Sequence, residues 1–176
     1  MLVDKSLEEM KREIRPVFET RERVRSTRDG YYIRHEERYQ AFYQRLLGDG
    51  DLHMDVTIFH LEMVCNAIEW GNSNDPRKYI TIAQYVGELG IVISVEDQGN
   101  GFDYESHFKL LRRGRNFTRR GREGKRWTGG RGLKWFHRGK DIEVNFNQRG
   151  NQIFGKYRYP REYEIDPSVA KALTSS

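Results

Sequence analysis

The sequence predicts a single α+β domain. Two segments with helical periodicity precede a pair of alternating, strand-like segments, and a second such pair lies near the C-terminus. We find no internal repeat and no long linker, so one layered domain accounts for most of the chain. We assign residues 1–30 to a charged N-terminal extension, 31–160 to the domain and 161–176 to a C-terminal tail.

Composition limits the class of protein. The chain has 176 residues, of which 36% are hydrophobic, 12% aromatic and 32% charged, and this favours a folded, polar-surfaced protein over a disordered one. The single cysteine, Cys65, excludes an intramolecular disulfide and a cysteine-rich zinc site. No apolar run approaches the roughly 20 residues of a membrane helix. We therefore expect a soluble cytoplasmic protein without a membrane partner.

The N-terminal extension contains two short predicted elements. Apolar residues recur at helical spacing between Leu7 and Val17, and Pro16 interrupts this helix. The segment Glu22–Thr27 alternates and predicts an edge strand.

Two helices are predicted next. The first covers Arg34–Leu47 and ends at a Gly-Asp-Gly turn. The second covers Leu52–Trp70 and is apolar on more than one face, which predicts a buried helix. Within it, Glu62 and Asn66 are four residues apart and share a narrow polar line with Glu69.

Two antiparallel hairpins are predicted after the helices. Tyr79–Val86 and Leu89–Glu96 form the first, and Asp141–Asn147 and Gln152–Tyr159 form the second. The basic segment 102–128 between them predicts part helix and part mobile loop, followed by a short helix that opens at residues 129–133.

Three polar and glycine motifs stand in a fixed order along the chain. They are Glu62-x-x-x-Asn66, then Asp97-x-Gly99-x-Gly101, then Gly130-x-Gly132-Leu133. Taken singly, each glycine pair also fits an ordinary turn, and the Glu/Asn pair also fits local hydrogen bonding or exposure to water.

Together these motifs describe a nucleotide site. Asp97 offers an acceptor for a purine amino group, and Gly99 and Gly101 let the backbone approach a flat ring. Backbone N–H groups in the second glycine loop suit phosphate oxygens. An acidic and an amide side chain in an apolar helix suit a magnesium ion with its phosphates, because Mg²⁺ prefers oxygen ligands.

With these motifs the sequence resembles the Bergerat-fold (GHKL) ATPase superfamily, and within it the anti-sigma-factor serine/threonine kinase branch. Glu62–Ala67 is similar to the N box, Val95–Asp103 to the first glycine box and Gly129–Leu133 to the second. The resemblance spans about Arg34–Tyr159. It departs from the pattern at Trp70, where many relatives have histidine, and we assign Trp70 no role.

The resemblance implies a two-layer sandwich in which a mixed, mostly antiparallel sheet is covered on one face by helices. It also implies ATP and Mg²⁺ as cofactors. The roles that it implies are the following: Glu62 as the catalytic base, Asn66 as the Mg²⁺ ligand, Asp97 as the adenine acceptor, Gly99 and Gly101 as the adenine pocket, and Gly130, Gly132 and Leu133 as the phosphate-binding end of a lid.

The function that follows is transfer of the ATP γ-phosphoryl group to Ser or Thr of a regulatory partner. The resemblance implies an anti-sigma-factor antagonist as substrate, a sigma factor or similar regulator as a binding partner, and allows a homodimer. The lid is rich in basic residues, namely Arg112, Arg113, Arg115, Arg119, Arg120, Arg122, Lys125 and Arg126. It either stabilises phosphoryl charge, docks an acidic partner or is simply a solvated face.

Two other functions remain open. A histidine-kinase-like domain would use His35 as phosphoacceptor, although a dimerisation hairpin needs a second long helix. A binding module would use the nucleotide only to set its affinity for a partner protein. We do not expect nucleic acid as a partner, because few aromatic residues are interspersed among the lid arginines.

Overall fold

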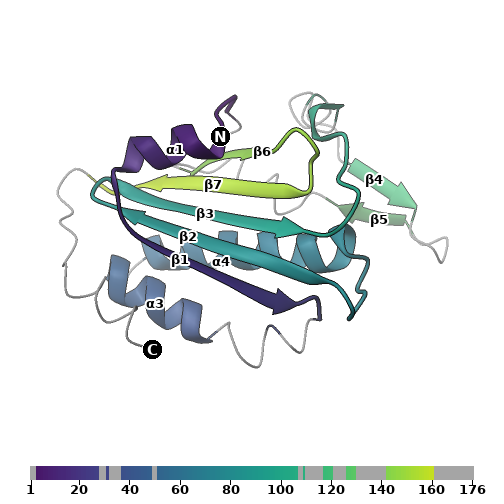
Figure 1. Ribbon diagram of the computed structural model, residues 1–176, viewed down its shortest axis with the longest axis horizontal. Helices are drawn as coiled ribbons and strands as arrows, with labels where there is room; N and C mark the ends of the chain where they lie inside the picture. The colour runs from purple at the N-terminus through teal and green to yellow at the C-terminus, as the bar shows by residue number, and fades with distance from the viewer. Residues whose placement is uncertain are drawn as a thin grey trace.

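The computed structural model describes residues 3–27, 31, 37–48, 51–106, 109, 117–120, 126–129 and 142–160. Its centre is a five-stranded sheet in the order β1-β2-β3-β7-β6, in which every neighbouring pair is antiparallel (Figure 1). The strands are β1 (Pro16–Arg25), β2 (Tyr79–Gly87), β3 (Gly90–Asp97), β6 (Ile142–Phe146) and β7 (Gln152–Arg158). The α+β class and both predicted hairpins are confirmed.

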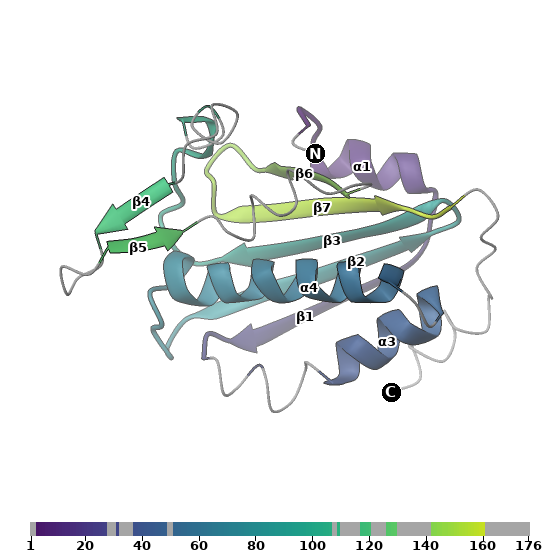
Figure 2. The same ribbon diagram turned by 180° about the vertical axis from the view of Figure 1, so that it is seen from behind.

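Two helices cover one face of the sheet. Helix α3 (Glu37–Leu47) and helix α4 (Asp51–Asn66) lie side by side on this face, and α4 runs along the strands (Figure 2). The main core fills the space between them and the sheet. The approach of α4 is close: a Cβ at Gly155 of β7 would lie 2.1 Å from the Phe59 ring.

Helix α4 is buried on one side and not all round. Phe59, Met63 and Val64 are buried against the sheet, whereas Met54 and Ile58 are 44% and 38% exposed. The predicted burial therefore holds only for the side that faces the strands. The predicted length is confirmed, because a single π-helical turn, η2 (Ala67–Gly71), continues the helix to Gly71.

A small polar network anchors both helices to β2. The hydroxyl of Tyr43 on α3 lies 2.6 Å from Nδ1 of His60 on α4 and accepts a hydrogen bond of 2.7 Å from the Gln84 amide. All three side chains are buried, and burial raises the pKa of Tyr43 well above its usual value. These bonds fix the α3–α4 layer on the sheet.

The opposite face of the sheet carries helix α1 (Leu7–Ile14), which the prediction of helices on one face did not include (Figure 1). Ser6 caps α1 reciprocally with Glu9, and the helix ends before Pro16, as predicted. The following strand begins at Pro16 rather than at the predicted Glu22. It is longer because its backbone pairs with β2 from Pro16 to Arg25.

A cluster of charges secures α1 to β6 and β7. Lys156, which is fully buried, is bonded to the Glu13 carboxylate of α1 and lies 2.8 Å from Oε2 of Glu143. Lys5 bridges the same two carboxylates at 2.7 and 3.0 Å, and Arg158 reaches Glu13 at 3.0 Å. Hydrogen bonds from Lys156 and Lys5 hold the pKa of Glu13 at about 2.

Glu13→Ala should destabilise the protein by about 2 kcal/mol, because it removes one of two carboxylates that compensate a buried ammonium group. Lys156→Met is the matched control and should cost less, because both carboxylates keep Lys5 as a partner. Urea unfolding of both variants measures this. The contribution of Glu13 is complete above its usual pKa of 4.5 and is lost as the pH falls towards 2, so the Glu13→Ala deficit should shrink over that range. Equal losses in the two variants would contradict this assignment.

The basic segment between the hairpins contains regular structure that the sequence did not predict. Residues 104–106 are helical, in agreement with the expected part helix, whereas strands β4 (Phe117–Arg120) and β5 (Arg126–Gly129) pair antiparallel where no strand was expected. They lie beyond the end of the sheet at which β3 finishes (Figures 1 and 2). Gly129 therefore ends a strand, and the rest of the helix predicted at residues 129–133 lies outside the described residues.

No helix within the described ranges is both long enough and apolar enough to cross a membrane.

Candidate functional site

The last turns of α4 carry the predicted catalytic and metal-binding side chains. Glu62 and Asn66 are one helical turn apart and both are half-buried. Among the described residues, neither side chain has a hydrogen bond or an ion pair. Within the described part of the chain, their oxygen atoms are therefore not occupied by another protein group.

The helix then widens into the π-helical turn η2. The N–H of Asn72 donates to the carbonyl of Ala67 at 2.8 Å, five residues earlier, where an α-helix would use the fourth. This turn ends at Gly71, which contacts the end of β3. The C-terminal ends of the helix and of β3 therefore meet at one edge of the molecule (Figure 2).

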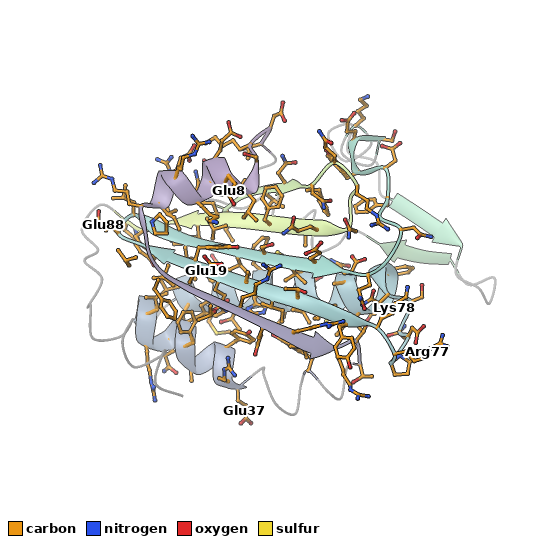
Figure 3. The ribbon with its side chains drawn as sticks, in the orientation of Figure 1. Glu8, Glu19, Glu37, Arg77, Lys78 and Glu88 are labelled. Carbon is orange, nitrogen blue, oxygen red and sulfur yellow. The ribbon has the colours of Figure 1, made fainter. Side chains whose placement is uncertain are left out.

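Asp97 is the last residue of β3 and lies at this junction. Its Oδ1 accepts the Gly99 N–H at 2.7 Å. Burial raises the pKa of Asp97 to about 6, although the Gly99 hydrogen bond and the charges of Lys78 and Arg149 oppose the shift. Lys78, directly before β2, lies at the same end of the sheet (Figure 3). A raised pKa of this kind is common among functional carboxyl groups.

Asn72 locks the loop that follows Asp97. It is completely buried; its Oδ1 accepts the Gln98 N–H at 2.8 Å and its Nδ2 donates to the Tyr79 carbonyl at 2.9 Å. The sequence analysis assigned this residue no role. An asparagine directly after a helix-ending glycine was the available signal.

Asn72→Ala should cost about 2 to 3 kcal/mol of stability, because it leaves the Gln98 N–H and the Tyr79 carbonyl without their partner. Gln98→Ala is the control. Its side chain is exposed, and among the described residues its one hydrogen bond is accepted from the Tyr79 N–H, so a loss of about 0.5 to 1 kcal/mol is expected. Chemical denaturation of the two variants compares them. A smaller loss in Asn72→Ala than in Gln98→Ala would refute the locking role.

The glycine loop after Asp97 is bonded to the turn between β6 and β7. Gly101 has φ +74°, and a Cβ there would lie 1.8 Å from the carbonyl of Arg149. Arg149 in turn donates from Nη2 to the Gly99 carbonyl at 3.1 Å. The close Arg149 backbone therefore requires glycine at position 101 even without a ligand. The sequence analysis instead attributed this glycine to the approach of a flat ring. A role of Gly99 and Gly101 in base binding stays a prediction.

The turn between β6 and β7 also fixes the backbone of Asp97. Asn151 donates from Nδ2 to the Asp97 carbonyl at 2.9 Å, and its own carbonyl accepts the Asp97 N–H at 2.9 Å. Asn147 orients Asn151 by a hydrogen bond of 2.9 Å between their side chains. The strand end is thereby held from two sides, by Asn72 and by Asn151.

A hollow of about 540 Å³ opens beside this loop. It is lined by residues 100–105 and by Gln148 and Arg149, and none of Glu62, Asn66 and Asp97 lines it. We therefore define the candidate site by its polar groups and not by this hollow.

Several predicted residues lie outside the described part of the chain. These are Gly130, Gly132 and Leu133 of the second glycine motif, and His35 of the histidine-kinase alternative. The side chains of the lid arginines are likewise outside it. Trp70, at the end of η2, is 39% exposed.

The donor set fits a nucleotide with its metal. Asp97 supplies an acceptor beside two close backbone segments, which suits the amino group of adenine. Within the described ranges no group of three or more His, Cys, Asp and Glu side chains could hold a metal ion. A Mg²⁺ ion at Asn66 would therefore take most of its ligands from phosphate and water, which is its usual manner of binding beside a nucleotide.

Comparison with known proteins agrees with this geometry. A family model described as "Histidine kinase-like ATPase domain" matches residues 33–153, a range that contains α3, α4, η2, the strands from β2 to β6 and the start of β7. A search of curated proteins found no match.

Proposed function

Since the chain belongs to the histidine kinase-like ATPase domain family, whose members bind ATP with Mg²⁺, we propose that it is a serine/threonine protein kinase of the anti-sigma-factor type. It would bind a sigma factor or similar regulator and phosphorylate an anti-sigma-factor antagonist. The resemblance of its three motifs to that branch supports this assignment.

One observation carries the proposal. Glu62 and Asn66 lie half-buried, without a partner among the described residues, on the helix whose end contacts Asp97. A base acceptor at Asp97 and oxygen ligands along α4 are the two halves of an ATP site, and the carboxylate at Glu62 is the additional group that a kinase needs.

The reaction follows from these groups. The hydroxyl oxygen of a Ser or Thr forms a bond to the γ-phosphorus, and the bond from that phosphorus to the β,γ-bridging oxygen breaks, so ADP leaves with the electron pair. The hydroxyl proton passes to the carboxylate of Glu62. Asp97 orients the nucleotide through its base, and Asn66 would hold Mg²⁺, which neutralises phosphate charge.

A labelling experiment separates this proposal from its alternatives. The full chain is incubated with γ-labelled ATP, Mg²⁺ and an antagonist protein, and the labelled residue is mapped. Acid-stable label on Ser or Thr of the antagonist supports the proposal. Acid-labile label on His35 of the chain itself would replace it by a histidine kinase. Nucleotide binding without transfer to either protein would leave a nucleotide-dependent binding module.

A further inference from the structure

The backbone conformation at position 71 does not require glycine. Its φ lies outside the positive region, which among the described glycines is found at Gly48, Gly101 and Gly150. The reason for glycine at this position is space. A Cβ on Gly71 would lie 2.2 Å from Cγ of Asp97 and 2.3 and 2.6 Å from its two carboxylate oxygens.

The same carboxylate is confined on its other side by Gly99. A Cβ on Gly99 would lie 2.7 Å from Oδ1 of Asp97 and 2.1 Å from the carbonyl of Gly71. The Gly99 N–H also donates to that Oδ1. The carboxylate of Asp97 thus occupies a slot between two glycine backbones, and the slot sets where its acceptor oxygens point.

The two glycines differ in what a side chain would disturb. At Gly99 it would meet the backbone carbonyl of Gly71, so the loop itself would have to move. At Gly71 the nearest atoms that it would meet are Cγ and the two oxygens of the Asp97 carboxylate, so this side chain would have to rotate out of the slot and lose its hydrogen bond from the Gly99 N–H. A methyl group at position 71 therefore displaces the carboxylate while leaving the fold in place.

We propose that Gly71 is a specificity-determining residue of the nucleotide site. Because position 71 has no Cβ, the Asp97 carboxylate can occupy the place from which it distinguishes adenine from guanine. This inference rests on the proposed function. Adenine presents an amino donor to an acceptor, whereas guanine presents a carbonyl oxygen at the corresponding position. An ionised carboxylate in a fixed place accepts a hydrogen bond from the amino group of adenine and repels the carbonyl oxygen of guanine.

The π-helical turn places Gly71 in this role. It ends at Gly71, and the next residue, Asn72, is bonded to the Gln98 N–H. The glycine backbone and the loop that carries Asp97 are therefore held together by a buried side chain. This connection fixes the slot before any nucleotide binds, which lowers the cost of orienting the base.

The test compares Gly71→Ala with the unaltered protein. Dissociation constants for ATP and GTP, each with Mg²⁺, are measured by calorimetry, and thermal melting without nucleotide monitors the fold. We expect ATP affinity to fall at least tenfold, the preference for ATP over GTP to fall towards one, and melting to change little. An unchanged preference would overturn the proposal.

A double-mutant cycle shows whether Gly71 acts through Asp97. In an Asp97→Ala background the slot is empty, so Gly71→Ala should have no further effect on either affinity. A full additional loss there would overturn the proposal, because it would mean that position 71 acts independently of the carboxylate.

A second variant tests the claim without altering Gly71. Asp97→Glu keeps the charge but moves the carboxylate by one methylene, so it should lose the ATP preference as Gly71→Ala does. Full discrimination by Asp97→Glu would overturn the proposal even if Gly71→Ala did not fold.

Should the unaltered protein bind ATP poorly in all conditions, the proposed function fails. If it binds ATP selectively and these variants keep the selectivity, only the role of Gly71 fails.

Discussion

Glu62→Gln is expected to reduce phosphoryl transfer by about 10²- to 10⁴-fold while ATP still binds, because the amide cannot take the hydroxyl proton. The side chain keeps its size and its half-buried place on α4, so the structural cost should be small. Initial rates of labelling of the antagonist protein, with ATP affinity measured in parallel, give the two quantities.

Glu37→Gln provides the control for this experiment. It removes one carboxylate from an exposed position at the start of α3, away from the junction of α4 and β3, and should leave the rate unchanged (Figure 3). Transfer at the original rate in Glu62→Gln would exclude this residue as the base. If both ATP binding and phosphoryl transfer were lost, Glu62 would be assigned to nucleotide binding instead.

Asp97→Asn is expected to weaken ATP binding by about 10- to 100-fold, the loss of a hydrogen bond to a charged acceptor. The pH dependence should change as well. Because burial raises the pKa of Asp97 to about 6, the acceptor form increases as the pH rises through 6, and ATP affinity should rise with it. Asp97→Asn should keep only the smaller dependence that comes from the phosphates. Calorimetric titrations between pH 5 and pH 8 would contradict this if the two proteins showed the same pH profile.

The same substitution should stabilise the protein in the absence of nucleotide. A carboxyl group whose pKa is raised in the folded state favours the folded state when protonated, so its ionisation destabilises increasingly above its usual pKa of 3.8 and fully above about 6. Asp97→Asn removes that cost. We expect the free energy of unfolding to rise by about 1 to 2 kcal/mol at pH 7.5, which is less than the full linkage value because the group is partly solvated. No gain is expected near pH 4.

The sequence predicted the elements that depend on local periodicity. The two hairpins and the long helix through Glu62 and Asn66 were found, because alternation and helical spacing report directly on which side chains face a core. The early start of β1 at Pro16 was missed, since its exposed outer side carries charges and its position is decided by pairing with β2. The place of α1 depends on the charges of Glu13 and Lys156, which are distant in the sequence.

The candidate site was predicted in its residue types but not in its construction. Asp97 and Gly99 were identified from the glycine motif, yet their joint contact with Gly71 needs a π-helical turn, which no residue pattern indicates. Asn72 and Asn151 were overlooked for the same reason. Each bonds to backbone groups of a distant segment, and such partners become visible only when the strands are in register.

The central claim is that α4 and the end of β3 form one site for ATP with Mg²⁺. Calorimetry of ATP binding with and without Mg²⁺, on the unaltered chain and on Asn66→Ala, tests it most directly. We predict that ATP binds, that Mg²⁺ strengthens the binding, and that Asn66→Ala removes most of this strengthening while nucleotide affinity without the metal is retained. No heat signal from ATP and Mg²⁺ with the unaltered protein would contradict the claim.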